Sequence, residues 1–325
     1  MGQVCKITGK AKHTIFYIMK KRNQHIDVAK GIGIILIVIG HMIGKDKVLS
    51  AFIYSFHVPL FFFLSGLFIN CDCSKNVFIN KTFKNILLPF INFSLIISII
   101  HLICGKEDTL INLLHHPPPA LWFLLILFLA HCLWYFSCYL FKGKIQELTS
   151  IIIFAILGYC LFSFNIVLPH AISSTFTATF YVGLGYILRK PILDNKYNNK
   201  SIGIISILLY LILLILVIVY NPETDLSENH LLLIGYIYSF IGITATLLLS
   251  QIINGHTMNI LSYLGKSSLS IMAVHMQFIF LSTLIIKPFI EFHLLYKIIE
   301  FIFVWILTLL TANIILKRFR WILGK

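Results

Sequence analysis

Residues 201–220 read SIGIISILLYLILLILVIVY and carry no charged side chain. A helix of about 20 apolar residues, rising 1.5 Å per residue, crosses the roughly 30 Å hydrocarbon core of a bilayer. The run is continuous and does not alternate apolar with polar residues, which argues against a strand of a transmembrane β-barrel. The segment therefore predicts a membrane-spanning helix, and the rest of the chain can be searched for others of the same kind.

Ten segments meet this criterion, and charged, proline and asparagine residues separate them. They cover residues 26–44, 51–70, 84–104, 120–140, 148–164, 172–188, 201–220, 230–253, 268–287 and 293–316. Segments 148–164 and 172–188 are short, and an uncharged linker joins them. We predict an all-α, polytopic membrane bundle of about ten helices over residues 26–316, with basic tails at residues 1–25 and 317–325.

The composition agrees with a protein that is surrounded by membrane lipids. Of the 325 residues, 58% are hydrophobic and 12% are charged, whereas a soluble domain carries about 25% charged residues. This composition excludes intrinsic disorder, and the seven scattered cysteines lack the spacing of a zinc site. The formal net charge of +14 would indicate a nucleic-acid partner on a soluble domain. In this chain the charges follow the loops, so no nucleic-acid partner is predicted.

The distribution of lysine and arginine predicts the orientation. With both termini placed in the cytoplasm, 21 of the 26 basic residues fall on the inner side and five on the outer side. Positive residues near helix ends favour the cytoplasmic side. We therefore expect both termini to be cytoplasmic and the first span to act as an uncleaved signal anchor.

The first predicted span carries three ionisable residues, which are costly inside a membrane and often functional. Eleven steps of 100° separate Lys30 from His41, so they share one face, about 16 Å apart along the axis. Asp27 lies three residues before Lys30 and can pair with it. Lys30 at the cytoplasmic mouth could hold the phosphates of coenzyme A, and His41 could act as a general base beside the thioester. A positive-inside anchor and a structural histidine would also satisfy the pattern.

The second predicted span contains FHVPLFFFLSG at residues 56–66. His57 lies about two turns in from the outer side, at a depth similar to that of His41, so the two histidines can meet. Pro59 removes one backbone hydrogen bond and can kink the helix, leaving a carbonyl free. We expect the aromatic residues 61–63 to face lipid, and Ser65 to bond to backbone instead of acting as a nucleophile.

Three further residues are candidates with competing structural explanations. Lys84 opens the third span beside Lys81, and the two could complete a funnel for phosphate groups or be solvated helix-end lysines. Trp122 lies near the outer boundary, where it could stack on a sugar ring or belong to an interfacial aromatic belt. His275 lies within the ninth predicted span, and a histidine there normally faces the interior of the bundle.

These residues resemble the signature of the membrane-bound acyltransferase 3 family. That signature has a basic residue, ten intervening residues and a histidine in the first helix, as in Lys30 and His41, with an acidic residue shortly before, as in Asp27. The stretch 56–66 is similar to the family's Phe-His-x-Pro-Leu-Phe-Phe-x-x-Ser-Gly motif. The basic position is often arginine in the family, and the lysine found here lacks an arginine's bidentate phosphate geometry.

The resemblance implies an O-acetyltransferase, similar to fucose 4-O-acetylase and surface-polysaccharide O-acetyltransferases, in the bacterial cytoplasmic (inner) membrane. Such an enzyme moves an acetyl group from acetyl-CoA, its co-substrate, to a hydroxyl of a cell-surface carbohydrate or glycolipid precursor. It needs no metal, and no residue pattern specifies an oligomeric state. The implied roles are general base for His41, oxyanion stabilisation or acceptor positioning for His57, donor binding for Lys30, Asp27 and Lys84, and substrate contact for Trp122 and His275.

Two other classes fit part of the pattern. A polytopic transporter or glycolipid flippase would also contain about ten helices with buried histidines. It has no stated reason to combine the spacing of Lys30 and His41 with the 56–66 motif. A membrane acyltransferase of the other large polytopic type would place its key histidine in a late span, where only His275 could serve.

Overall fold

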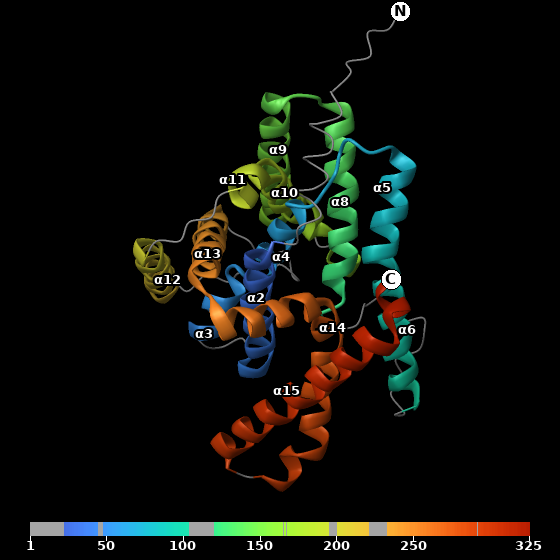
Figure 1. Cartoon of the computed structure of the whole chain (residues 1–325), viewed down its shortest axis with the longest axis vertical. Helices are drawn as coiled ribbons and strands as arrows, with labels where there is room; N and C mark the ends of the chain where they lie inside the picture. Colours follow the sequence, from blue (N-terminus) through green and yellow to red (C-terminus); the bar gives the residue numbers. More distant parts are fainter. Residues whose placement is uncertain are drawn as a thin grey trace, which may run out of the picture.

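The computed structural model describes residues 23–44, 48–103, 120–164, 166, 168–194, 200–220, 233–290 and 292–325. Within these ranges the regular elements are helices, which confirms the predicted all-α class (Figure 1). Residues 1–22, most of the predicted N-terminal tail, lie outside the described residues.

The helices follow one another in a simple order along the chain. They are α2 (Gln24–Ile43), α3 (Val48–Tyr54), α4 (His57–Gly66), α5 (Lys75–Thr82), the π-helical turn η1 (Phe83–Leu87), α6 (Leu88–Ile103), α8 (Trp122–Leu140), α9 (Lys144–Ser163), the 3-10 turn η2 (Pro169–Ser174), α10 (Thr175–Ile187), α11 (Arg189–Asp194), α12 (Lys200–Tyr220), α13 (Leu233–Ile252), α14 (Gly255–Ile285), η4 (Lys287–Phe289), α15 (His293–Arg318) and η5 (Arg320–Leu323).

Nine helical segments in the described ranges are long and apolar enough to cross a membrane. They correspond to nine of the ten predicted spans, with α3 and α4 joined into one segment and α5, η1 and α6 into another. The tenth predicted span, 172–188, appears as α10, which has 13 residues and follows the turn η2. The protein is therefore an integral, multi-pass membrane protein.

The relative directions of the helices indicate that α10 also crosses the membrane. Gly66 of α4 packs against α10 at Val182, and beyond it the Arg189 side chain donates to the carbonyl of Ile69 at 3.1 Å, so α4 and α10 run parallel. In the same way, Gly31 of α2 packs on Leu261 of α14, and His41, ten residues later in α2, contacts His275, which is later in α14. The helices α2 and α14 therefore also run parallel. Parallel helices have an odd number of crossings between them. Six segments of spanning length separate α2 from α14, and α10 makes the seventh.

Two glycines allow α2 and α14 to approach closely. A Cβ atom at Gly265 would collide with the carbonyl oxygen of Asp27, and one at Gly31 would collide with the carbonyl of Leu261. Small residues at such a contact let two backbones pack directly in a membrane. The contact lies near the beginning of α2, in a part of α14 that precedes the predicted span 268–287. Hydropathy missed this part because polar residues such as His256 and Lys266 interrupt it.

Pro59 divides the second span as expected. The helix breaks between α3 and α4, and Phe56 has a φ of −143°. A proline lacks the N–H that would bond to the carbonyl four residues earlier, here that of Ser55. The hydroxyl of Ser239 in α13 donates to this carbonyl at 2.6 Å. The break is therefore stabilised by a neighbouring helix, and it places Tyr54 and His57 on either side of a bend.

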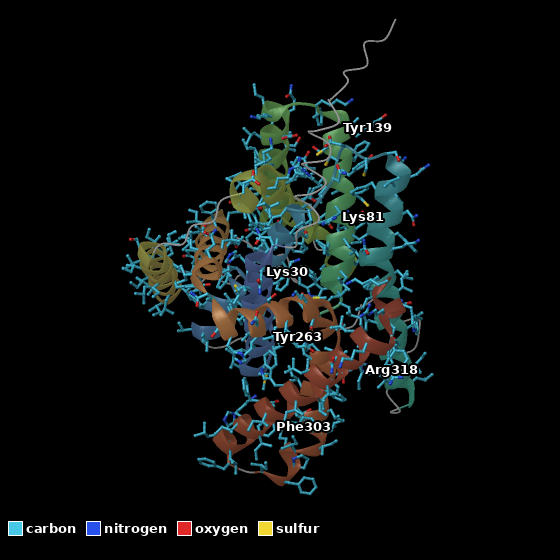
Figure 2. All side chains as sticks on the ribbon, viewed as in Figure 1. Lys30, Lys81, Tyr139, Tyr263, Phe303 and Arg318 are labelled. Atoms are coloured by element: carbon cyan, nitrogen blue, oxygen red, sulfur yellow. The ribbon has the colours of Figure 1, made fainter. Side chains whose placement is uncertain are left out.

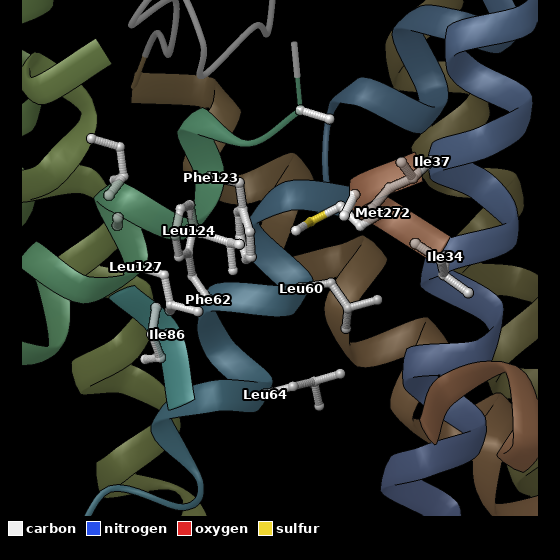
Figure 3. Packing of buried hydrophobic residues seen from close by; sticks show 14 of the residues in the cluster. Ile34, Ile37, Leu60, Phe62, Leu64, Ile86, Phe123, Leu124, Leu127 and Met272 are labelled. Atoms are coloured by element: carbon white, nitrogen blue, oxygen red, sulfur yellow. The ribbon is translucent and has the colours of Figure 1, made fainter. Parts of the chain in front are cut away.

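The prediction that residues 61–63 face lipid was wrong for two of the three. Phe62 is fully buried and Phe63 is 2% exposed, whereas Phe61 is half-buried. Figure 3 shows Phe62 beside Phe123 of α8, and their ring centroids are 4.7 Å apart. Because α4 is covered by both α8 and α10, its aromatic residues form part of the core of the bundle.

Candidate active site

Four aromatic polar side chains from four helices meet near the end of α2. The hydroxyl of Tyr54 in α3 lies 3.2 Å from Nδ1 of His41 in α2. The ring centroid of His275 in α14 lies 5.3 Å from that of His41, and the ring of His57 in α4 lies 5.0 Å from that of Tyr54. The structure thus brings three of the predicted histidines together and adds a tyrosine.

Backbone hydrogen bonds fix the tautomers of two of these histidines. Nδ1 of His57 lies 2.8 Å from the carbonyl of Ile53, and Nδ1 of His275 lies 2.8 Å from that of Met272. Since a carbonyl only accepts, Nδ1 carries the proton in both neutral rings and Nε2 holds a lone pair. Both side chains are buried, and Nε2 of His275 has no hydrogen-bond partner among the described residues. An unpaired buried acceptor is costly in a merely structural residue.

His41 is the more accessible member of this group. Its side chain is half-buried, whereas His57 is 3% exposed and His275 is fully buried. Tyr54 and His275 contact its ring from two directions, so the ring has a fixed orientation. A half-buried imidazole held in this way is suited to take a proton from a bound hydroxyl group.

Lys30 lies in the second turn of α2, in the half of the helix opposite His41, next to a cavity. Its Nζ is 5.3 Å from the centroid of the Phe68 ring, and Phe68 lines a cavity of about 240 Å³ between α4, α5, η1 and α8. Figure 2 shows Lys30 on α2 and Lys81 on α5, and the side chain of Lys81 lines the same cavity. The other polar residues of its wall are Ser65, Asn70, Cys73, Thr82, Asn85 and His131.

The remaining predicted residues, Asp27, Lys84 and Trp122, lie outside both the histidine cluster and the cavity. Asp27 is 4% exposed and lies at the glycine contact between α2 and α14. Lys84 is exposed in η1, with its carbonyl next to Gly324, and it does not line the cavity. Trp122 is the first residue of α8 and packs, half-buried, against the main hydrophobic cluster.

The prediction that Ser65 bonds to backbone is confirmed. Its hydroxyl donates to the carbonyl of Phe62 at 2.7 Å, and Nε2 of His131 in α8 lies 3.1 Å from the same oxygen. Because the serine proton is committed to the carbonyl, the oxygen accepts from His131 instead of losing its proton to it. This pair therefore contributes fixed polar groups to the cavity wall. In the described ranges, no group of three or more His, Cys, Asp or Glu residues is placed to hold a metal ion.

Sequence reasoning missed Tyr54 and His131. His131 could have been found by the rule that ionisable residues within a span face the interior, because it lies in the middle of the span 120–140. Tyr54 had no such signal, since a tyrosine near a membrane boundary is common. Its contact with His41 of α2 becomes visible only in the structure.

Comparisons with known proteins identify the family. The family model Acyl_transf_3, an acyltransferase domain, matches residues 23–317, which cover nearly the whole of the described helices. No curated protein and no solved structure was found to match the chain. The matched range includes the histidine cluster at one end of α2 and the lysine-lined cavity at the other. The chain therefore belongs to the membrane-bound acyltransferase 3 family and is a membrane acyltransferase.

Proposed function

We propose that this protein transfers an acetyl group from acetyl-CoA to a hydroxyl of a cell-surface carbohydrate or of its lipid-linked precursor. The observation that carries the proposal is the arrangement on α2. An imidazole oriented by Tyr54 and His275 lies at one end of the helix, and a cation beside a cavity lies at the other. The two groups share one face about 16 Å apart, which suits an elongated thioester with a phosphorylated end.

The cavity supports entry of the donor from the side of Lys30. Lys30 and Lys81 supply positive charge near it, and the amides of Asn70 and Asn85 supply hydrogen bonds. Ammonium groups bind phosphate as point charges, so they attract the nucleotide part of the donor without fixing its geometry. The excess of basic residues in the loops on this side favours the cytoplasm, where acetyl-CoA is made. The proposal takes the bacterial cytoplasmic membrane as the location of the enzyme.

His41 is the general base in the proposed reaction. It takes the proton of the acceptor hydroxyl as that oxygen attacks the thioester carbonyl; the new C–O bond forms and the C–S bond breaks. The proton then passes from His41 to the departing thiolate, which leaves as the free thiol. His57 carries its proton on Nδ1, bonded to the Ile53 carbonyl, so its Nε2 has no proton to offer an oxyanion. This tautomer supports the role of positioning the acceptor by accepting a hydroxyl hydrogen.

The test is release of thiol from acetyl-CoA by the purified protein in detergent, with a thiol reagent and membrane-extracted glycolipids as acceptor. A positioned base is typically worth 10²–10⁴-fold, so His41→Ala should reduce the rate by at least about 10²-fold. His256→Ala is the matched control, because His256 is exposed at the beginning of α14. Thiol release that is unchanged in His41→Ala would overturn the role of His41. Wild-type protein that moves glycolipid across vesicles without releasing thiol would instead identify a flippase.

A further inference from the structure

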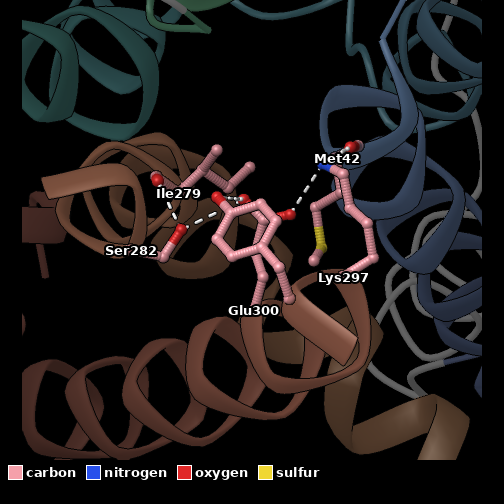
Figure 4. Close-up of polar contacts among 6 residues, drawn as sticks. Met42, Ile279, Ser282, Lys297 and Glu300 are labelled. Atoms are coloured by element: carbon pink, nitrogen blue, oxygen red, sulfur yellow. Dashed lines mark hydrogen bonds and ion pairs between the residues drawn. The ribbon is translucent and has the colours of Figure 1, made fainter. Parts of the chain in front are cut away.

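A carboxylate is buried in α15, close to the end of α2. Glu300 is 1% exposed, and its Oε1 accepts from the hydroxyl of Tyr296 at 2.8 Å and lies 3.0 Å from Oγ of Ser282. Its Oε2 lies 2.8 Å from Nζ of Lys297 (Figure 4). Both oxygen atoms of this carboxylate therefore have polar partners, which hold the carboxylate in one orientation.

Lys297 connects this carboxylate to α2. The same Nζ donates to the carbonyl of Met42 at 2.8 Å, and Met42 follows His41 directly in sequence. The last carbonyls of a helix have no partner within it, and the helix end carries partial negative charge. Lys297 thus supplies from another helix both the hydrogen bond and the positive charge that the end of α2 needs.

The chain turns sharply just after this contact. Gly44 has φ 78° and ψ 176°, a conformation that is essentially restricted to glycine, so α2 stops there. The last turn of α2 is therefore held by its own backbone, by Tyr54 and by Lys297. Among these contacts, the one from Lys297 carries a charge, and Lys297 belongs to a helix far away in sequence.

An ion pair within a membrane bundle calls for an explanation beyond stability. Glu300 is buried, whereas the Lys297 side chain is 35% exposed. Ion pairs that are partly exposed contribute about 0–1 kcal/mol, and burial of a charge has a desolvation cost that offsets the attraction. Charged residues inside membrane spans are rare and mark functional places. Here the lysine of the pair bonds to Met42, the residue next to the proposed base His41.

We propose that Lys297, oriented by Glu300, is a positioning residue that holds the last turn of α2 so that His41 points at the acceptor. This inference rests on the proposed function. The contact that the structure shows between this pair and the last turn of α2 runs from Lys297 to the backbone carbonyl of Met42. Small displacements of a catalytic group cost up to about 10²-fold in rate.

The test compares five variants of the whole chain. Lys297→Met removes the charge and the donor, and Lys297→Arg retains both. Glu300→Gln keeps the acceptor for Tyr296 but loses the charge, and the double variant Lys297→Met/Glu300→Gln leaves no unpaired buried charge. Lys317→Met, at an exposed lysine near the other end of the same helix, is the control.

We expect Lys297→Met to lower kcat by about ten- to hundred-fold with an unchanged KM for acetyl-CoA, because the donor binds at the other end of α2. Lys297→Arg should retain most of the rate, and Lys317→Met all of it. The double variant separates positioning from folding. It should recover the thermal stability lost in Lys297→Met while kcat stays low, and a recovery of kcat along with stability would overturn the proposal.

A second measurement does not depend on catalysis. Hydrogen exchange of the peptide covering residues 38–44 should become faster in Lys297→Met and in the double variant, but not in Lys317→Met. Unchanged exchange in this peptide would overturn the proposal even if kcat fell. If the wild type released no thiol, the proposed function would fail, and the exchange data would still show whether Lys297 holds the end of α2.

Discussion

The phenolic oxygen of Tyr54 and Nδ1 of His41 lie 3.2 Å apart, which joins the end of the first membrane span to the beginning of the second. The edge of the same tyrosine ring packs on His57, at a centroid distance of 5.0 Å. Tyr54 therefore contacts both histidines that the sequence proposes for catalysis. Tyr54 and His57 are three positions apart and lie on either side of the break between α3 and α4.

Removal of the Tyr54 hydroxyl should slow the reaction without unfolding the protein. Tyr54→Phe keeps the ring against His57 and deletes the hydrogen bond to His41, which contributes about 0.5–1.5 kcal/mol. We expect kcat to fall by about ten-fold and the KM for acetyl-CoA to stay unchanged, as measured by thiol release. Tyr263→Phe, at an exposed tyrosine of α14, is the matched control. A Tyr54→Phe enzyme with the wild-type kcat would show that the hydroxyl does not orient the base.

Replacement of His275 should separate activity from stability. His275→Phe fills the same buried space, and the lost acceptor Nε2 had no hydrogen-bond partner among the described residues. We therefore expect the free energy of unfolding to change by no more than about 1 kcal/mol, while thiol release drops by at least about ten-fold. Thermal unfolding in detergent and the thiol assay measure the two quantities on one preparation. A large loss of stability with normal specific activity would make His275 a structural residue.

Lys30 should affect binding of the donor more than the chemical step. Its Nζ lies beside the cavity wall at Phe68, and a hydrogen bond to a charged group contributes about 1.5–3 kcal/mol. Lys30→Met should therefore raise the KM for acetyl-CoA by about ten-fold or more with little change in kcat, whereas Lys30→Arg should retain the wild-type KM. Lys190→Met changes an exposed lysine in α11 and provides the control. An unchanged KM in Lys30→Met would leave Lys30 as a topological anchor only.

The glycine contact between α2 and α14 should be sensitive to a single methyl group. Gly265→Ala places a Cβ atom against the backbone of Asp27, which cannot move aside as a flexible side chain can. Overpacking of this kind typically costs about 1–3 kcal/mol, so the melting temperature in detergent should fall by several degrees. At Gly203 the added atom would meet only the end of the Ile252 side chain, and Gly203→Ala should be tolerated. Equal melting temperatures for the two variants would contradict the packing described here.

Much of the fold could be predicted from the sequence because membrane helices depend on local composition. The apolar runs located nine helices of spanning length in the described ranges, and the spacing of Lys30 and His41 placed both on one face of α2. The short helix α10 illustrates why the count needs more than length. Its 13 residues are fewer than a membrane-spanning helix requires. Because α10 runs parallel to α4, it nevertheless has to be included among the membrane crossings.

The residues that the sequence did not reveal depend on contacts between distant helices. Phe62 lies in an aromatic run that resembles a lipid-facing surface, and only the positions of α8 and α10 show that it is buried. Lys297 was counted among the basic residues of the outer side, because nothing in the sequence links it to Met42, 255 positions earlier. The sequence near Glu300 indicates only an ion pair with Lys297, three residues earlier on the same helix face.

The parallel pairing of α2 with α14 also constrains biosynthesis. The α2 helix is synthesised first, whereas α14, which supplies His275, is synthesised only after seven further crossings. Until then Gly31 lacks its packing partner on α14, and the histidine cluster is incomplete. The ring contact between His41 and His275 can therefore form only after α14 has been synthesised.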